Sequence, residues 1–132
     1  MDSESLDELW RRKKLQTVRL MEVNDLTRQL LQAAERRDRV SVSMILAMRE
    51  DPVQRLGEME TALRAYVNAL PQEDAIRAAE IFDGAEASGA DEARLCEQVA
   101  QYRRLLESTL EMDRRLSLRM GGNRSFYKMF RT

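Results

Sequence analysis

The sequence predicts an all-α protein: an elongated antiparallel bundle of three long helices, with one short helix in a connection. Only five glycines and two prolines occur among 132 residues. Charged residues make up 34% of the chain and hydrophobic residues 43%, a mixture typical of long helices with a solvated outer face. Apolar side chains recur at spacings of three and four over long stretches. The length suits one domain, which we expect over residues 1–122, followed by an aromatic and basic tail over residues 123–132.

The first long helix is expected over residues 5–36, which contain neither glycine nor proline. Residues 6–15 are less regular in their apolar spacing, and we expect that end of the helix to fray. Further along, the stripe expected to face the core follows helical periodicity. It consists of Leu20, Val23, Leu26, Thr27, Leu30, Leu31 and Ala34.

A second long helix is expected to begin after Asp38, whose carboxylate can accept the free amide hydrogens of a first helical turn. The short connection requires the two helices to run antiparallel. The spacing of three and four continues through Pro52, which favours one continuous helix kinked at the proline. The alternative is a new helix capped by Asp51, with Pro52 at its first position and Gln54 completing a capping box. The apolar stripe comprises Ile45, Met48, Pro52, Leu56, Met59, Leu63, Tyr66 and Leu70.

Leu70-Pro71 ends this helix, because the residue before a proline avoids the helical conformation. The stretch "QEDAIRAAEIFDG" then predicts a short helix with Ile76, Ala79 and Phe82 inward and Gly84 as its stop. After the loop "GAEASGAD", Asp91 is expected to cap the last long helix, with Asp113 pointing outward at the edge of the stripe and Gly121-Gly122 ending the helix. That stripe consists of Leu95, Val99, Tyr102, Leu106, Leu110, Leu116 and Met120.

Composition disfavours several classes of function. The net charge is −1, from 22 basic and 23 acidic side chains, so we expect neither a nucleic-acid nor a membrane partner. The opening "MDSESLDELWRRKK" does not resemble a secretory signal, and no run of about 18 apolar residues occurs; we expect a cytoplasmic protein. The chain has no histidine and one cysteine, Cys96. No metal, cofactor or enzymatic activity is therefore expected.

The second long helix carries the candidate surface for a protein partner. Met44, Met48 and Met59 share it with larger apolar residues, and flexible thioethers can repack around different partner helices. The alternative is self-association into a homodimer, because part of the stripe follows heptad spacing. The candidate partner-binding residues of this helix are Ile45, Met48, Leu56, Met59, Leu63 and Tyr66.

Three aromatic residues, Phe126, Tyr127 and Phe130, lie among the last seven of the chain. Burying three rings would stabilise a docked tail by about 15 kcal/mol. Ordering the backbone of that segment costs a similar amount, at about 1–2 kcal/mol per residue. The tail can therefore dock on its own bundle, dock on a partner, or exchange between the two. We include the three rings among the candidate partner-binding residues.

The stretch "LTRQLLQAAERRDRVSVSMILAMREDPVQRLGEME", residues 26–60, resembles the bacterial flagellar export chaperones of the FlgN/FliT type. The resemblance implies a cytoplasmic, all-helical, non-enzymatic chaperone that holds an amphipathic end of a secretion substrate. It further implies a client groove along the apolar positions of the second helix. The competing interpretation is a self-associating structural or regulatory bundle with no export role.

Overall fold

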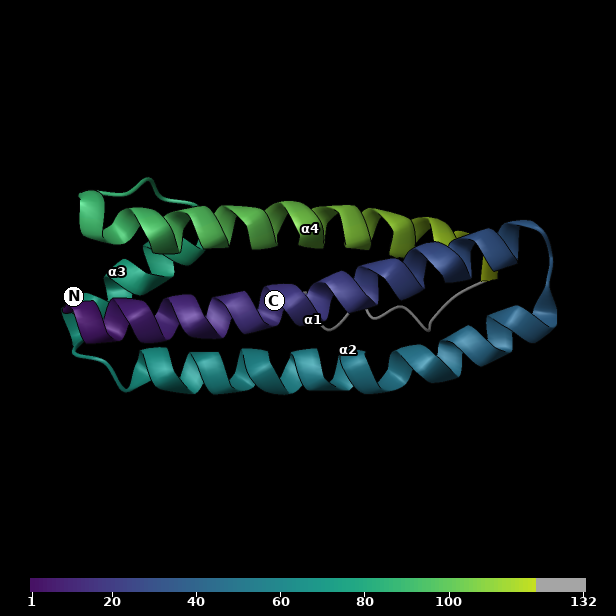
Figure 1. Ribbon diagram of the computed structural model, residues 1–132, viewed down its shortest axis with the longest axis horizontal. Helices are drawn as coiled ribbons and strands as arrows, with labels where there is room; N and C mark the ends of the chain where they lie inside the picture. Colours follow the sequence, from purple (N-terminus) through teal and green to yellow (C-terminus); the bar gives the residue numbers. More distant parts are fainter. Residues whose placement is uncertain (121–132) are drawn as a thin grey trace.

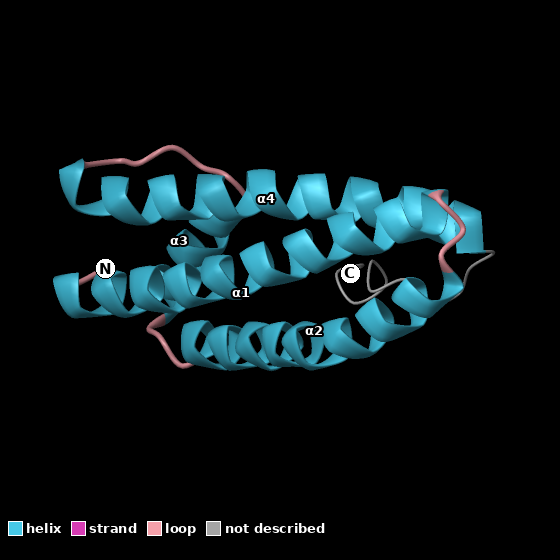
Figure 2. Ribbon diagram, turned by 45° about the vertical axis from the view of Figure 1, so that its right-hand side comes forward, coloured by secondary structure: helices cyan, strands magenta, loops and turns pink. Residues whose placement is uncertain are grey.

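The computed structural model describes residues 1–120, which form four helices and no strand. Three helices are long, α1 (Ser3–Glu35), α2 (Arg39–Asn68) and α4 (Ala90–Met120), and α3 (Gln72–Phe82) is short. The 33 residues of α1 span about 50 Å at about 1.5 Å per residue. The long helices lie side by side (Figure 1), and the loops lie at the ends of the bundle (Figure 2). This confirms the all-α class and the helical bundle.

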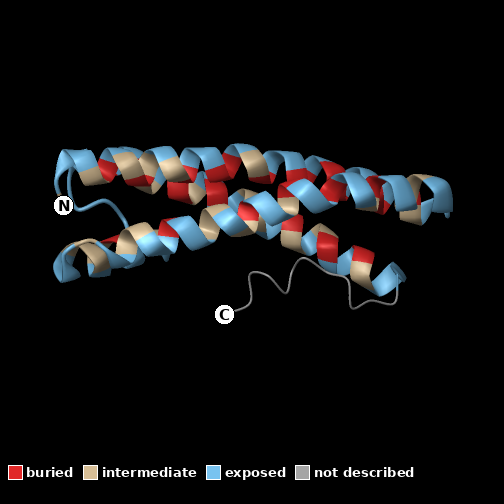
Figure 3. Ribbon diagram, turned by 90° about the horizontal axis from the view of Figure 1, so that it is seen from below, coloured by how far each residue is buried: buried red, intermediate tan, exposed pale blue. Residues whose placement is uncertain are grey.

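Helix α1 is the central element. It packs along both α2 and α4, while α3 packs against both of these helices at one end of the bundle. Buried residues follow the facing sides of the helices (Figure 3). They form three clusters, around Leu9 beside α3, around Leu20 in the middle, and around Leu30 beside the α1–α2 turn. The core therefore runs the whole length of the bundle.

The expected fraying at the start of α1 is wrong. The helix begins at Ser3, and the Asp2 side chain accepts a hydrogen bond of 2.8 Å from the Ser5 amide. Leu6 is 5% exposed and Leu9 is fully buried, because this end of α1 packs against α3 and the start of α4. Tertiary packing outweighs the irregular local pattern.

Asp38 caps α2 as expected. Its carboxylate accepts hydrogen bonds from the backbone amide of Ser41, at 3.1 Å, and from the Ser41 hydroxyl, at 2.6 Å. Just before it, Arg37 has φ of 57°, and the amide of Asp38 donates to the carbonyl of Ala33 at 2.9 Å. This is the backbone arrangement that usually ends a helix on a glycine.

Helix α2 is continuous through Pro52, which confirms the single helix and excludes the new start at Asp51. Pro52 has no amide hydrogen to donate within the helix and its ring crowds the preceding turn. Helices bend at such positions. Figure 1 shows α2 changing direction along its length.

The short helix α3 lies where expected but presents a different face to the core. Ile76 is 54% exposed, whereas Ala78 and Ile81 are fully buried. Ala79 is also exposed, and of the expected inward residues only Phe82 packs against the core. An 11-residue helix carries too few apolar residues to fix its rotation, so its neighbours decide it.

Gly84 ends α3 with φ of +103°, as expected for a glycine stop. Helix α4 begins at Ala90, so Asp91 lies inside its first turn and is not its cap. Instead, the Glu92 carboxylate accepts hydrogen bonds from the Ser88 amide at 3.0 Å and the Ser88 hydroxyl at 2.9 Å. The expected stop at residues 121–122 and the boundary to the tail lie outside the described residues.

Candidate functional site

Three of the six α2 positions predicted for partner binding belong to the bundle's own core. Ile45 is 6% exposed, Leu56 is fully buried, and Leu63 is 2% exposed. All three belong to core clusters that also contain side chains of α1 and α4. The predicted client groove is therefore already filled by the chain's own helices.

The other predicted positions lie in different surroundings. Met59 and Tyr66 are partly buried, and the Arg12 guanidinium lies 5.0 Å from the centre of the Tyr66 ring. Met48 is 53% exposed. The three tail rings, Phe126, Tyr127 and Phe130, lie outside the described residues.

The first half of α2 carries apolar side chains on two of its sides, one toward the core and one away from it. Ile45 faces the core, while Val42 and Leu46 are partly buried against it. Away from the core lie three exposed residues at four-residue spacing, which we call the Met flank. They are Val40, 80% exposed, Met44, 57% exposed, and Met48, 53% exposed. Met44 and Met48 are singled out by the sequence, whereas Val40 is not, although the four-residue spacing of these three residues is visible there.

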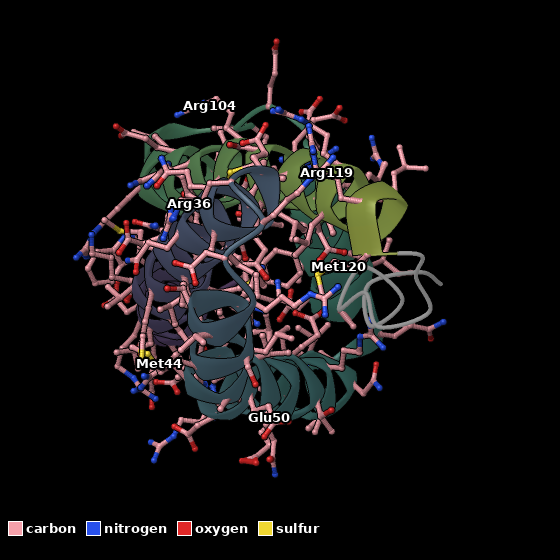
Figure 4. All side chains as sticks on the ribbon, turned by 90° about the vertical axis from the view of Figure 1, so that its right-hand side faces the viewer. Arg36, Met44, Glu50, Arg104, Arg119 and Met120 are labelled. Carbon is pink, nitrogen blue, oxygen red and sulfur yellow. The ribbon has the colours of Figure 1, made fainter. Side chains whose placement is uncertain are left out.

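A pocket of about 420 Å³ lies at the same end of the bundle. We call it the end pocket, and it is formed by the end of α1, the start of α2 and the end of α4. Figure 4 looks at this end of the bundle: Met120 lies toward α2, and Met44 lies on another side of the bundle. The lining residues are Ala34, Arg37, Arg39, Val42, Ser43, Leu46, Arg119 and Met120.

A second cavity of about 320 Å³ lies between α2 and α3. Leu63, Val67 and Phe82 give it an apolar wall, and Glu60 and Asp83 contribute carboxylates. The Phe82 ring connects this cavity to a buried lysine on α1, because its centre lies 5.1 Å from the ammonium nitrogen of Lys13.

Lys13 is a charged residue inside the bundle. It is 6% exposed, and its Nζ lies 3.8 Å from the centre of the Tyr102 ring. Burial lowers the pKa of Lys13 to about 8, although the Glu60 carboxylate acts in the opposite direction. The Glu60 carboxylate in turn accepts a hydrogen bond of 2.9 Å from the side-chain amide of Gln16. Burial likewise raises the pKa of Tyr102.

Asp113 is fully buried, so the expectation that it points outward is wrong. It faces Arg49 of α2, with 3.5 Å between Arg49 Nη1 and Asp113 Oδ1. The same Arg49 nitrogen donates to the Thr27 hydroxyl of α1 at 3.2 Å. Burial lowers the pKa of Arg49, whereas Asp113 raises it. This polar contact joins all three long helices.

Hydrogen bonds between side chains also join α1 directly to α4. Asn24 donates to the Thr109 hydroxyl at 2.7 Å, and Gln98 donates to the Thr17 hydroxyl at 2.9 Å. A polar group that loses its partner inside a bundle is costly. These pairs therefore fix the register of the two helices.

The most strongly paired carboxylate belongs to the α3–α4 corner. The pKa of Glu92 falls to about 2, mainly because Arg77 donates to it and also because the Ser88 amide does. The shortest of the three Arg77–Glu92 hydrogen bonds is 2.6 Å. Cys96, on the next turn of α4, is partly buried, and burial raises its pKa. The low pKa of Glu92 therefore follows from its local hydrogen bonds, and the raised pKa of Cys96 follows from its burial.

Within residues 1–120, no group of three or more His, Cys, Asp or Glu side chains is placed to hold a metal ion. None of the four described helices has a stretch apolar enough to cross a membrane. The Met flank and the arginine-lined end pocket are two exposed features of the described residues that suit contacts with another macromolecule. No protein-family model, curated protein or solved structure matches the chain.

Proposed function

We propose that this protein is a helical chaperone or adaptor that binds an amphipathic helix of a partner protein on the first half of α2. The observation that carries the proposal is the exposure of the Met flank. A surface helix normally presents polar and charged residues on the side away from the core, yet α2 carries exposed apolar side chains there. A partner helix would complete its burial.

The spacing of the Met flank fits helix-on-helix packing. Residues four apart lie on one face about one turn apart, so Val40, Met44 and Met48 form a short ridge. At about 25 cal/mol per Å², burying their exposed parts would contribute at most about 8 kcal/mol in total, before the cost of association. Methionine side chains can adjust to partners of different shape. A partner needs further contacts beyond this ridge to bind tightly.

The proposal moves the binding surface away from the predicted groove. A partner helix could reach Ile45, Leu56 and Leu63 only by displacing α1 or α4, whereas the Met flank is open in the folded bundle. The more specific role, a cytoplasmic chaperone for a flagellar export substrate, rests on the resemblance of residues 26–60. It is part of the proposal on that ground alone.

The Met flank also supports self-association, the second candidate function. Two copies of a ridge at four-residue spacing can pack on each other in an antiparallel pair. Light scattering over a dilution series decides between the two functions. A dimer that persists on dilution, and that Met44→Glu with Met48→Glu converts to a monomer, would assign the flank to a second copy.

The direct test is binding of a fluorescent, 20-residue designed amphipathic helix, measured by anisotropy. We expect the variant Met44→Glu/Met48→Glu to bind at least about tenfold more weakly than the wild type, because carboxylates on the ridge would have to be desolvated. The control variant, Ala62→Glu/Ala65→Glu, adds the same charge to exposed positions of the same helix. Equal affinities for wild type and Met-flank variant would refute the proposal.

A further inference from the structure

The end pocket has an apolar floor and a cationic rim. Val42, Leu46 and Met120 supply the floor, and Arg37, Arg39 and Arg119 supply the charge, with no acidic residue in the lining. At about 420 Å³, the pocket has room for one or two large apolar side chains. The Met flank lies on another side of α2 (Figure 4), so the two surfaces are separate.

The positive charge of this rim is not balanced locally. Glu35 is shared by two guanidinium groups, those of Arg115 and Arg119, each at 3.6 Å. Within residues 1–120, neither Arg37 nor Arg39 forms a hydrogen bond or an ion pair through its side chain. Two cations beside the pocket are therefore available to an outside carboxylate.

The helix dipole accounts for the position of Arg119 but not for the positions of Arg37 and Arg39. Arg119 lies in the last turn of α4, where a cation offsets the negative end of the helix dipole. Arg39 is the first residue of α2, where the dipole favours an anion. A residue such as Arg39, placed where the helix dipole disfavours its charge and where no contact among residues 1–120 compensates for it, is a candidate functional residue.

Arg37 breaks a second local rule. Its φ of 57° is a conformation that costs a non-glycine residue free energy. The same backbone motif ends α3, where the corresponding residue is Gly84. Glycine would suit the backbone at residue 37 better but would remove the guanidinium from the pocket.

We propose that the end pocket is a docking site for an acidic segment of a partner protein, in which carboxylates flank one or two large apolar side chains. The apolar side chains enter between α2 and α4, and the carboxylates pair with Arg37 and Arg39. Planar guanidinium groups can bind carboxylates through two parallel hydrogen bonds. The chain's own residues 121–132 contain Arg124, Lys128 and Arg131 and no acid, so their charge does not match this rim.

The test uses three 12-residue peptides that share two leucines and differ only in flanking Glu, Gln or Lys residues. Binding to the full-length protein is followed by NMR chemical shifts, which detect weak complexes and locate them. For the wild type, we expect the Glu peptide to bind about tenfold more tightly than the Gln peptide. We expect added salt to reduce this preference and the shifts to centre on Arg37, Arg39 and Leu46.

The variant Arg37→Gly/Arg39→Gln should lose the preference for the Glu peptide. Because glycine relieves the backbone at residue 37, Arg37→Gly alone should not lower the melting temperature, which separates loss of binding from loss of folding. A control variant, Arg55→Gln/Arg104→Gln, removes the same charge from exposed positions elsewhere and should keep the preference. Met44→Glu/Met48→Glu should keep it as well.

Several results would overturn the proposal. Equal affinity for the Glu and Lys peptides would do so, as would a Glu preference that survives in Arg37→Gly/Arg39→Gln. Shifts centred on the Met flank would place the peptide elsewhere. A dimer dissociated by the arginine variant would assign the pocket to a second copy of the chain. Apart from shifts centred on the Met flank, these results do not bear on helix binding there, which is tested with the Met44→Glu/Met48→Glu variant.

Discussion

Replacing Lys13 by methionine should stabilise the protein at neutral pH. The Lys13 ammonium lies inside the bundle, 6% exposed, and burial lowers its pKa from 10.5 to about 8. At about 1.4 kcal/mol per pKa unit, holding the charged form in the core costs about 3 kcal/mol. The contact with the Tyr102 ring at 3.8 Å offsets about 1 kcal/mol. Methionine fills a similar volume without a charge, so the expected net gain is about 2–3 kcal/mol.

The pH dependence identifies the cause of this gain. Between pH 8 and 10.5 the folded state binds the Lys13 proton more weakly than the unfolded state does. The stability of the wild type, measured relative to Lys13→Met, must therefore rise with pH across this window. Below pH 8 lysine is charged in both states and carries the full cost. Above pH 10.5 it is neutral in both states, and the difference should nearly disappear.

The assay is urea denaturation followed by circular dichroism at pH 7, 8, 9 and 10. The wild type, Lys13→Met and Lys14→Met are compared at each pH. Lys14 is the exposed neighbour of Lys13, so its replacement should change stability little at any pH. Two results would refute the reasoning: a variant less stable than the wild type at pH 7, or a difference that does not change between pH 7 and pH 10.

Three further predictions concern buried contacts and turns. Asp113→Ala removes the carboxylate facing buried Arg49 and should lower the free energy of unfolding by about 3–5 kcal/mol. In urea denaturation, the double variant Asp113→Ala/Arg49→Met should recover most of this loss. If the losses of the two single variants simply add in the double variant, the prediction is wrong. Glu92→Gln should cost about 1.5 kcal/mol at pH 7. Because Arg77 holds the pKa of Glu92 near 2, the stability difference between the wild type and Glu92→Gln should shrink as the pH drops from 4.5 toward 2. Thermal melts of both proteins across that range measure this difference. Gly84→Ala, at φ of +103°, should lower stability by about 1 kcal/mol or more; an unchanged melting temperature would contradict the strain argument.

Local chemistry predicted the helices well. Long stretches without glycine or proline became α1 and α4, Asp38 caps α2, and Gly84 ends α3. Each of these features depends on residues close together in the sequence, so the sequence alone carries the information. The continuity of α2 through Pro52 also followed from local spacing.

The errors concern contacts between distant segments. An apolar stripe shows that a face is buried but not which element buries it: Ile45, Leu56 and Leu63, predicted to bind a partner, lie in core clusters shared with residues of α1 and α4. The partner of Asp113 is Arg49, 64 positions away, and no local pattern indicates that pairing. The end pocket likewise forms only when three helix ends meet.

The central position of α1 has a consequence for folding during synthesis. The side of α1 that receives α4 has no partner until the residues between Glu35 and Ala90 have been translated, which takes several seconds at about 5–20 residues per second. During that interval the nascent hairpin of α1 and α2 exposes this side to other chains on the ribosome. Thr17 and Asn24, which later bind Gln98 and Thr109, place polar groups there and make the waiting surface less prone to aggregate.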